Sequence, residues 1–144
     1  MDEKEFRLLG FNFLKILAER RPDFKGELPN IESNIDIKSI EQQKTDLLKE
    51  ETLKLEFNFV LNYKDLGKIE MNGNLIVMFS LKISKQILED WKEKRLPENI
   101  RLPILNLILQ RSSLKALQLE EEIGLPLHVR LPTLQQAGPS SNSK

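Results

Sequence analysis

The stretch LKLEFNFVLNYKDLGKIEMNGNLIVMFSL, residues 53–81, decides the fold. Apolar and polar residues alternate along it in two runs, which a short polar break at 63–68 separates. Alternation with a period of two is typical of β-strands that bury one face. Because the break is short and contains Asp65 and Gly67, it favours an antiparallel hairpin over a crossover connection. The sequence therefore predicts two long paired strands at the centre of the core.

The segment 6–20 is ambiguous on periodicity, because its apolar residues fit both helical spacing and alternation. The cluster of Phe11, Phe13 and Ile16 after Gly10 favours a strand. Proline and glycine residues within 22–30 then mark a loop.

A further strand is predicted within 31–42, where Ile35 and Ile37 alternate. Ile40 is out of phase by one residue, which indicates either a β-bulge or the end of the strand. The charged residues 45–51 predict an irregular connection, and Gly73 indicates another bulge in the second central strand.

Helices are predicted after the strands, because the period changes from two to about 3.6 residues at Ser84. We expect a short helix over 84–94 with Ser84 as its N-cap. A longer helix begins at Glu98 or Pro103 and ends at 123, since Gly124 suits the position just past a helix end.

The long helix carries more apolar residues than one buried face requires. Other apolar side chains surround the first half of its main stripe, so this helix is predicted to be covered on more than one side. The predicted stripe consists of Leu102, Leu105, Leu109, Ser112, Ala116, Leu119 and Ile123.

Length and composition bound the remaining possibilities. The chain of 144 residues fits one domain, which we place at 1–134, followed by a disordered tail at 135–144. Its 22 basic and 22 acidic residues cancel, so no global charge attracts nucleic acid or membrane. It has no cysteine, and neither a signal peptide nor a membrane-spanning run is recognisable. We expect a soluble cytoplasmic protein.

Few residues suggest catalysis or metal binding. No nucleophile elbow, phosphate loop or H-E-x-x-H motif occurs, and His128 is the only histidine. His128 is expected to be exposed or partly packed, and the acidic run 120–122 to be a solvated helix face. The sequence thus predicts a protein that is not an enzyme and uses neither a metal nor a cofactor.

With its elements placed, the chain resembles the SecB export chaperone and its SecB-like relatives. The likeness lies in residues 11–20 before a Pro/Gly loop, in IDIKSIEQQ, and in the two central strands LKLEFNFVLNY and GKIEMNGNLIVMFSL. It continues in ILNLILQRSSLKALQLEEEIGLPLHVRLP, which is similar to that family's long helix and extended crossover. The chain is also similar to uncharacterised archaeal proteins that end in a helix, G-L-P and L-P.

The resemblance implies a four-stranded antiparallel sheet backed by the long helix. Together with the short helix predicted above, the expected fold is α+β, with the sheet followed by a short helix and a long helix packed on the sheet. It also implies dimers or tetramers and ATP-independent binding of unfolded polypeptides. Two features differ: the family has a second helix after the crossover, and the helix at 84–94 is an addition or a displaced element. Candidate interface or peptide-binding residues are Val60, Ile76, Met78, Trp91, Ile104, Leu107 and Leu114.

An alternative function is a structural factor associated with the ribosome or RNA. It rests on clustered cations, above all Arg111 and Lys115, which lie one helical turn apart and could contact phosphate together. Steep loss of binding with salt would distinguish this alternative from polypeptide binding.

Overall fold

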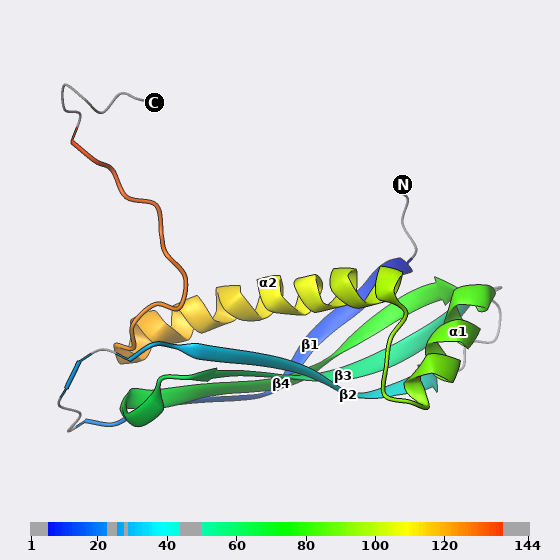
Figure 1. The fold of residues 1–144 in the computed structure, drawn as a ribbon, viewed down its shortest axis with the longest axis horizontal. Helices are drawn as coiled ribbons and strands as arrows, with labels where there is room; N and C mark the ends of the chain where they lie inside the picture. Colours follow the sequence, from blue (N-terminus) through cyan, green and yellow to red (C-terminus); the bar gives the residue numbers. More distant parts are fainter. Residues whose placement is uncertain (1–5, 23–25, 28, 44–49, 137–144) are drawn as a thin grey trace.

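The computed structural model describes residues 6–22, 26–27, 29–43 and 50–136 (Figure 1). Its elements are β1 (Phe6–Arg20), β2 (Glu32–Gln43), β3 (Glu50–Asn62), the 3₁₀ helix η1 (Lys64–Leu66), β4 (Gly67–Ser80), α1 (Leu81–Trp91) and α2 (Glu98–Ile123). The predicted α+β architecture is confirmed. Neither described helix is long and apolar enough to span a membrane.

The four strands form one antiparallel sheet in the order β1-β4-β3-β2. The predicted hairpin is its centre, with β3 and β4 joined through η1, and the segment 6–20 is a strand as expected. Strand β3 already begins at Glu50, within the predicted connection, and 45–49 lie outside the described residues. Because β1 and β2 each pair with one neighbour only, they are the two edges of the sheet.

Register shifts keep apolar side chains on the core face. The shift in β2 lies between Ile37 and Ser39, so that Ile40 pairs with Leu55 and is buried. This confirms the bulge as the reason for the change of phase. The predicted bulge at Gly73 instead lies in the partner strand, where Leu14 is the extra residue of β1.

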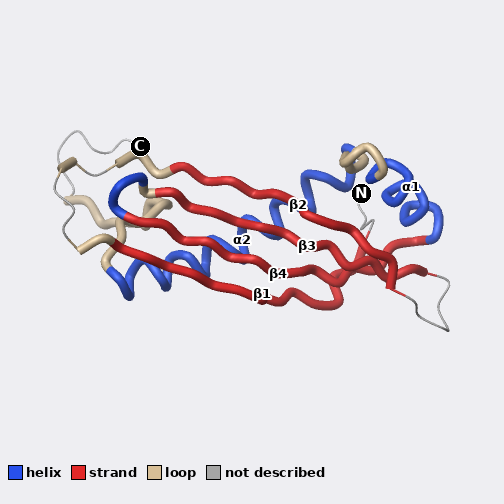
Figure 2. The backbone as a smooth tube through the Cα atoms, turned by 90° about the horizontal axis from the view of Figure 1, so that it is seen from below, coloured by secondary structure: helices blue, strands red, loops and turns tan. Residues whose placement is uncertain are grey.

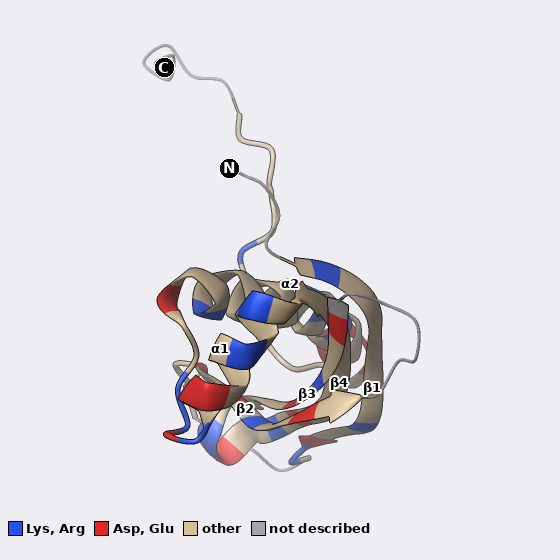
Figure 3. Cartoon of the chain, turned by 90° about the vertical axis from the view of Figure 1, so that its right-hand side faces the viewer, with Lys and Arg blue, Asp and Glu red and all other residues tan. Residues whose placement is uncertain are grey.

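Helix α2 lies in the concave side of the curved sheet (Figure 3). The predicted stripe is wrong in its first half, since Leu102 and Leu109 are exposed. The buried side chains recur every four residues instead, and such a row is inclined to the helix axis, which allows it to follow a twisted sheet. They are Ile100, Ile104, Ile108, Ser112, Ala116 and Glu120.

The helix ends differ partly from prediction. Ser80, and not Ser84, is the N-cap of α1, and its Oγ accepts a hydrogen bond from the backbone N–H of Ile83 at 3.3 Å. Ser84 is buried one turn later, where its hydroxyl donates to Glu51. Of the two predicted starts of α2, the structure has Glu98. Gly124 ends this helix with a left-handed φ of 75°, as predicted.

The face of the sheet opposite α2 is mainly polar, and no described helix lies on it (Figure 2). Asn12 donates to Asn74 across β1 and β4 at 3.1 Å, and Asn72 donates to Asn58 across β4 and β3. Lys54 and Glu41 form an ion pair at 3.5 Å. Side chains paired in this way make the surface stable in water. The binding role suggested for Val60, Ile76 and Met78 on this face stays a prediction.

Candidate functional site

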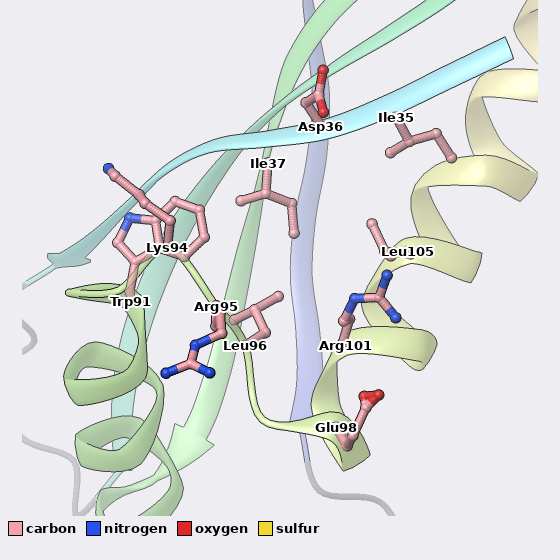
Figure 4. Close-up of a pocket in the computed structure, with 10 residues that line it drawn as sticks. All are labelled: Ile35, Asp36, Ile37, Trp91, Lys94, Arg95, Leu96, Glu98, Arg101 and Leu105. Carbon is pink, nitrogen blue, oxygen red and sulfur yellow. The ribbon is translucent and has the colours of Figure 1, made fainter.

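A cavity of about 550 Å³ opens between the edge strand β2 and the segment that joins α1 to α2 (Figure 4). It is built from three parts of the chain: the middle of β2, the end of α1 with the following connection, and the first turns of α2. Its lining residues are Ile35, Asp36, Ile37, Trp91, Lys94, Arg95, Leu96, Glu98, Arg101 and Leu105.

Strand β2 forms one wall. Because side chains alternate along a strand, Ile35 and Ile37 point toward the cavity while Asp36 points to the other side (Figure 4). Both isoleucines are half-buried and pack against the main core. The same strand is an edge of the described sheet, so backbone N–H and C=O groups on its outer side have no neighbouring strand among the described residues. An apolar wall and a free strand edge therefore lie together.

The connection after α1 forms the second wall through a C-terminal capping turn. The backbone N–H of Lys94 donates to the carbonyl of Trp91 at 2.9 Å, and that of Arg95 donates to Asp90 at 3.3 Å. This pair of bonds is the Schellman motif, in which Gly usually takes the left-handed position. Here Lys94 takes it, with a φ of 60°. The turn places the Lys94 ammonium over the Trp91 ring, 5.0 Å from its centroid.

Helix α2 closes the third side and brings charge to the rim. Arg101 and Glu98 lie on its first turns, with Leu105 one turn further. The lining holds three cations and two carboxylates in all, so its charge is slightly positive. An apolar interior with a mixed, mainly basic rim suits a ligand that is apolar and carries an acidic group.

A second feature is a buried polar cluster at the far end of α2. The Glu120 carboxylate is fully buried and accepts a hydrogen bond from the Tyr63 hydroxyl. The backbone N–H of His128 donates to the same carboxylate at 3.3 Å, and His128 Nδ1 lies 3.0 and 3.1 Å from its two oxygens. Glu120 therefore joins the end of β3, the helix α2 and the C-terminal segment.

The cluster of Tyr63, Glu120 and His128, which we call the lock, has a structural role. Burial, and then the hydrogen bond and charge of Glu120, raises the pKa of Tyr63 above its usual range, so the hydroxyl stays protonated as a donor. His128 Nε2 is buried without a hydrogen-bond partner among the described residues. Since the three donors that contact Glu120 converge on its two oxygens, we assign these residues to holding the chain together.

The candidate interface or peptide-binding residues predicted from the sequence lie in different parts of the structure. Trp91 lines the cavity. Ile104 is fully buried in the core, so it does not belong to an accessible surface of the single chain, whereas Leu114 is 64% exposed on α2 and Leu107 is half-buried. The opposite face of the sheet carries Val60, Ile76 and Met78.

The possible phosphate-binding pair, Arg111 and Lys115, stays a prediction. The Arg111 guanidinium lies over the Phe11 ring, 5.4 Å from its centroid. Lys115 donates to Gln118 at 3.4 Å. Each cation therefore has a contact within the chain.

Two features were missed by reasoning from sequence. Glu120 was expected on a solvated face together with Glu121 and Glu122, yet only the latter two are exposed. The spacing of four residues that leads from Ile100 to Glu120 could have indicated that Glu120 is buried. The apolar residues of the predicted stripe favoured another face of the helix instead. Ile35 and Ile37 were seen only as strand residues, because the sequence did not indicate that β2 is an edge.

Comparison with known proteins gives a distant structural likeness. No family model and no curated protein matches the sequence. The fold is similar to that of the SecB-like chaperone Rv1957 of Mycobacterium tuberculosis, solved in complex with a ChAD peptide from the antitoxin HigA1. The likeness covers 91% of this chain and 88% of that chain, with a TM-score of 0.43 and 10% sequence identity. No residue role is transferred across so distant a likeness.

Proposed function

We propose that the protein binds extended, apolar segments of other polypeptides in the cavity beside β2 and holds them without ATP. One observation carries the proposal: an edge strand of the described sheet borders a cavity whose lining is half apolar and half charged. A segment that pairs with a strand edge forms backbone hydrogen bonds, and these do not depend on the sequence of the segment. Its alternate side chains then point to one face, where the cavity receives them.

The composition of the cavity supports a broad choice of ligand. Ile35, Ile37, Leu96 and Leu105 offer apolar contact without a polar group that would select one side chain. Trp91 adds a large, half-exposed aromatic surface of the kind enriched where proteins bind one another. The basic rim adds a preference for segments with a nearby Asp or Glu.

Self-association is the second part of the proposal. Large apolar side chains are exposed on the outer side of α2, with Leu102 at 56% and Leu114 at 64%, and on the edge strand β1, with Leu14 at 65%. A symmetric partner that covers such side chains removes them from water. We expect a dimer or a tetramer, which light scattering would distinguish from the 16.8 kDa monomer.

Replacing Ile37 with glutamate tests the binding site. A carboxylate at this position would have to enter the apolar cavity beside any bound segment, and an uncompensated buried charge is strongly unfavourable. We expect the wild-type protein to suppress aggregation of a heat-unfolded client at stoichiometric amounts, and Ile37→Glu to lose most of this effect. The measurement is light scattering of the client.

Leu81→Glu is the matched control, because Leu81 is 45% exposed and does not line the cavity. It should suppress aggregation as the wild type does. Both variants are first checked for native circular dichroism. Equal suppression by wild type and Ile37→Glu would contradict binding in this cavity, and a folded wild type without any effect would contradict polypeptide holding altogether.

A further inference from the structure

The described part of the chain ends in residues 125–136, which lie outside any helix or strand and which we name the C-terminal arm. Apolar and polar residues alternate in its sequence, with His128 and Arg130 between Leu127, Val129 and Leu131, and the backbone bends at His128 and Val129. The three apolar side chains are 38%, 38% and 49% exposed, and Leu134 further on is fully exposed. In an extended conformation the alternation would bring these apolar side chains to one side, which suits the apolar half of the lining of the cavity beside β2.

The arm is fixed at its base and free beyond it. Leu125 is buried, its backbone N–H donates to the Glu120 carbonyl at 3.0 Å, and His128 contacts the Glu120 carboxylate. Beyond this anchor the arm runs away from the sheet and from α2 (Figure 1). Val129, Arg130 and Leu131 therefore have a defined starting point and are exposed, with Val129 and Leu131 only partly covered by their own chain.

The pattern of the arm matches that of β2. Paired residues on neighbouring strands point to the same face, so a strand added at β2 with Arg130 opposite Asp36 places Val129 and Leu131 beside the two isoleucines of the cavity wall. Arg130 and Asp36 would then form an ion pair, and neither has an ion-pair partner among the residues that the structure describes. Backbone N–H groups of successive residues in a strand point to opposite sides. If the N–H groups of Val129 and Leu131 point toward β2, position 132 points away from it, so the N–H group that Pro132 lacks is not needed for pairing.

The arm of the same chain does not reach this position. Leu105, which lines the cavity, lies 15 residues before Glu120 on the same helix, or about 22 Å along α2. Arg130 lies two residues beyond His128, which spans about 7 Å at most. With His128 held by Glu120, the arm that pairs with β2 has to come from another molecule.

We infer that the C-terminal arm of one copy pairs with the edge of β2 in a second copy and fills the cavity there. Two copies can do this reciprocally, which closes the assembly as a symmetric dimer. The arm and a client would use the same cavity, so the arm would shield it until a client displaces the arm. Arm pairing itself needs no client, so it stands or falls separately from the proposed function.

The absence of cysteine from the chain allows a direct test by disulfide cross-linking. Asp36→Cys and an affinity-tagged Arg130→Cys are prepared as separate full-length proteins, mixed and mildly oxidised. Each molecule carries one thiol, so every disulfide between the two positions joins two copies. We expect the mixed dimer, identified by the mass of the tag, to be several-fold more abundant than either dimer of one variant with itself.

Two variants make the result decisive. A tagged Glu122→Cys, exposed on α2, replaces Arg130→Cys as the control for random collision and should give only background. Val129→Lys added to Arg130→Cys should abolish the mixed dimer, because it directs a further cation toward a lining that already holds three cations and two carboxylates. A mixed dimer no more abundant than the Glu122→Cys background, or one unchanged by Val129→Lys, would overturn arm exchange, even if client binding is observed.

Discussion

Replacing Glu120 with alanine lowers the free energy of unfolding by about 3–5 kcal/mol, the cost expected when one member of a buried charged group is removed. The substitution leaves the Tyr63 hydroxyl and the His128 imidazole buried without their acceptor. It also opens a space where α2, the end of β3 and the arm meet. Denaturant unfolding followed by far-UV circular dichroism measures the loss.

The adjacent Glu121 is the control for this substitution. Glu121 is exposed and is predicted from the same acidic run, so Glu121→Ala should change the free energy of unfolding by no more than about 0.5 kcal/mol. Equal effects of the two substitutions would contradict the assignment of Glu120 as the centre of the lock.

Replacing Gly73 with alanine is expected to cost about 3 kcal/mol or more, because added atoms in a packed site force the backbone apart. A β-carbon at Gly73 would overlap the backbone carbonyl of Asn12 in β1. It would also lie 2.8 Å from the Phe57 ring, which packs against Phe11 with centroids 5.2 Å apart. The Asn12 carbonyl cannot move without disturbing the β1–β4 pairing, and the Phe57 ring cannot move without disturbing its packing against Phe11. Thermal or denaturant unfolding reads out the loss.

Gly10 provides the matched control on the opposite strand of the same pair. The nearest atom to an added β-carbon there is Ile76 Cγ1 at 3.7 Å, which is ordinary contact. Gly10→Ala should therefore leave stability within about 1 kcal/mol of the wild type, or raise it slightly by restricting the unfolded chain. A Gly73→Ala variant as stable as Gly10→Ala would contradict the close approach of β1 to β4.

The strands could be predicted from sequence because they bury one face only. Apolar and polar residues then alternate along each strand, and the change of phase at Ile40 indicates the bulge of β2. The helix boundaries were harder to predict from the sequence. Ser80 and Ser84 are both plausible N-caps in sequence, and the choice depends on where Ser84 finds room beside Glu51.

The contacts of α2 and the cavity could not be predicted in the same way. A helix with apolar residues on most sides is compatible with more than one buried row, and the twist of the sheet selects the row through Ile104 and Glu120. The cavity depends on the order of strands in space, which makes β2 an edge. Trp91 was recognised, but its neighbours on β2 were not, because they are far away in sequence.

The burial of Glu120 also explains how the candidate site and the arm are related. The lock holds His128 at one end of α2, while the cavity lies at the other end. Loss of the lock through Glu120→Ala should therefore free the base of the arm without altering the cavity wall. The proposed ligand binding and the placement of the arm would thus depend on two separate parts of the fold.

The central claim is that an extended apolar segment enters the cavity beside β2. Trp91 is the only tryptophan of the chain and lines this cavity, so its fluorescence reports the event directly. Titration with an unfolded, tryptophan-free polypeptide should shift the emission to shorter wavelength and saturate, and Ile37→Glu should abolish the shift. Binding of the polypeptide, seen by light scattering, with no change in Trp91 emission would contradict the claim.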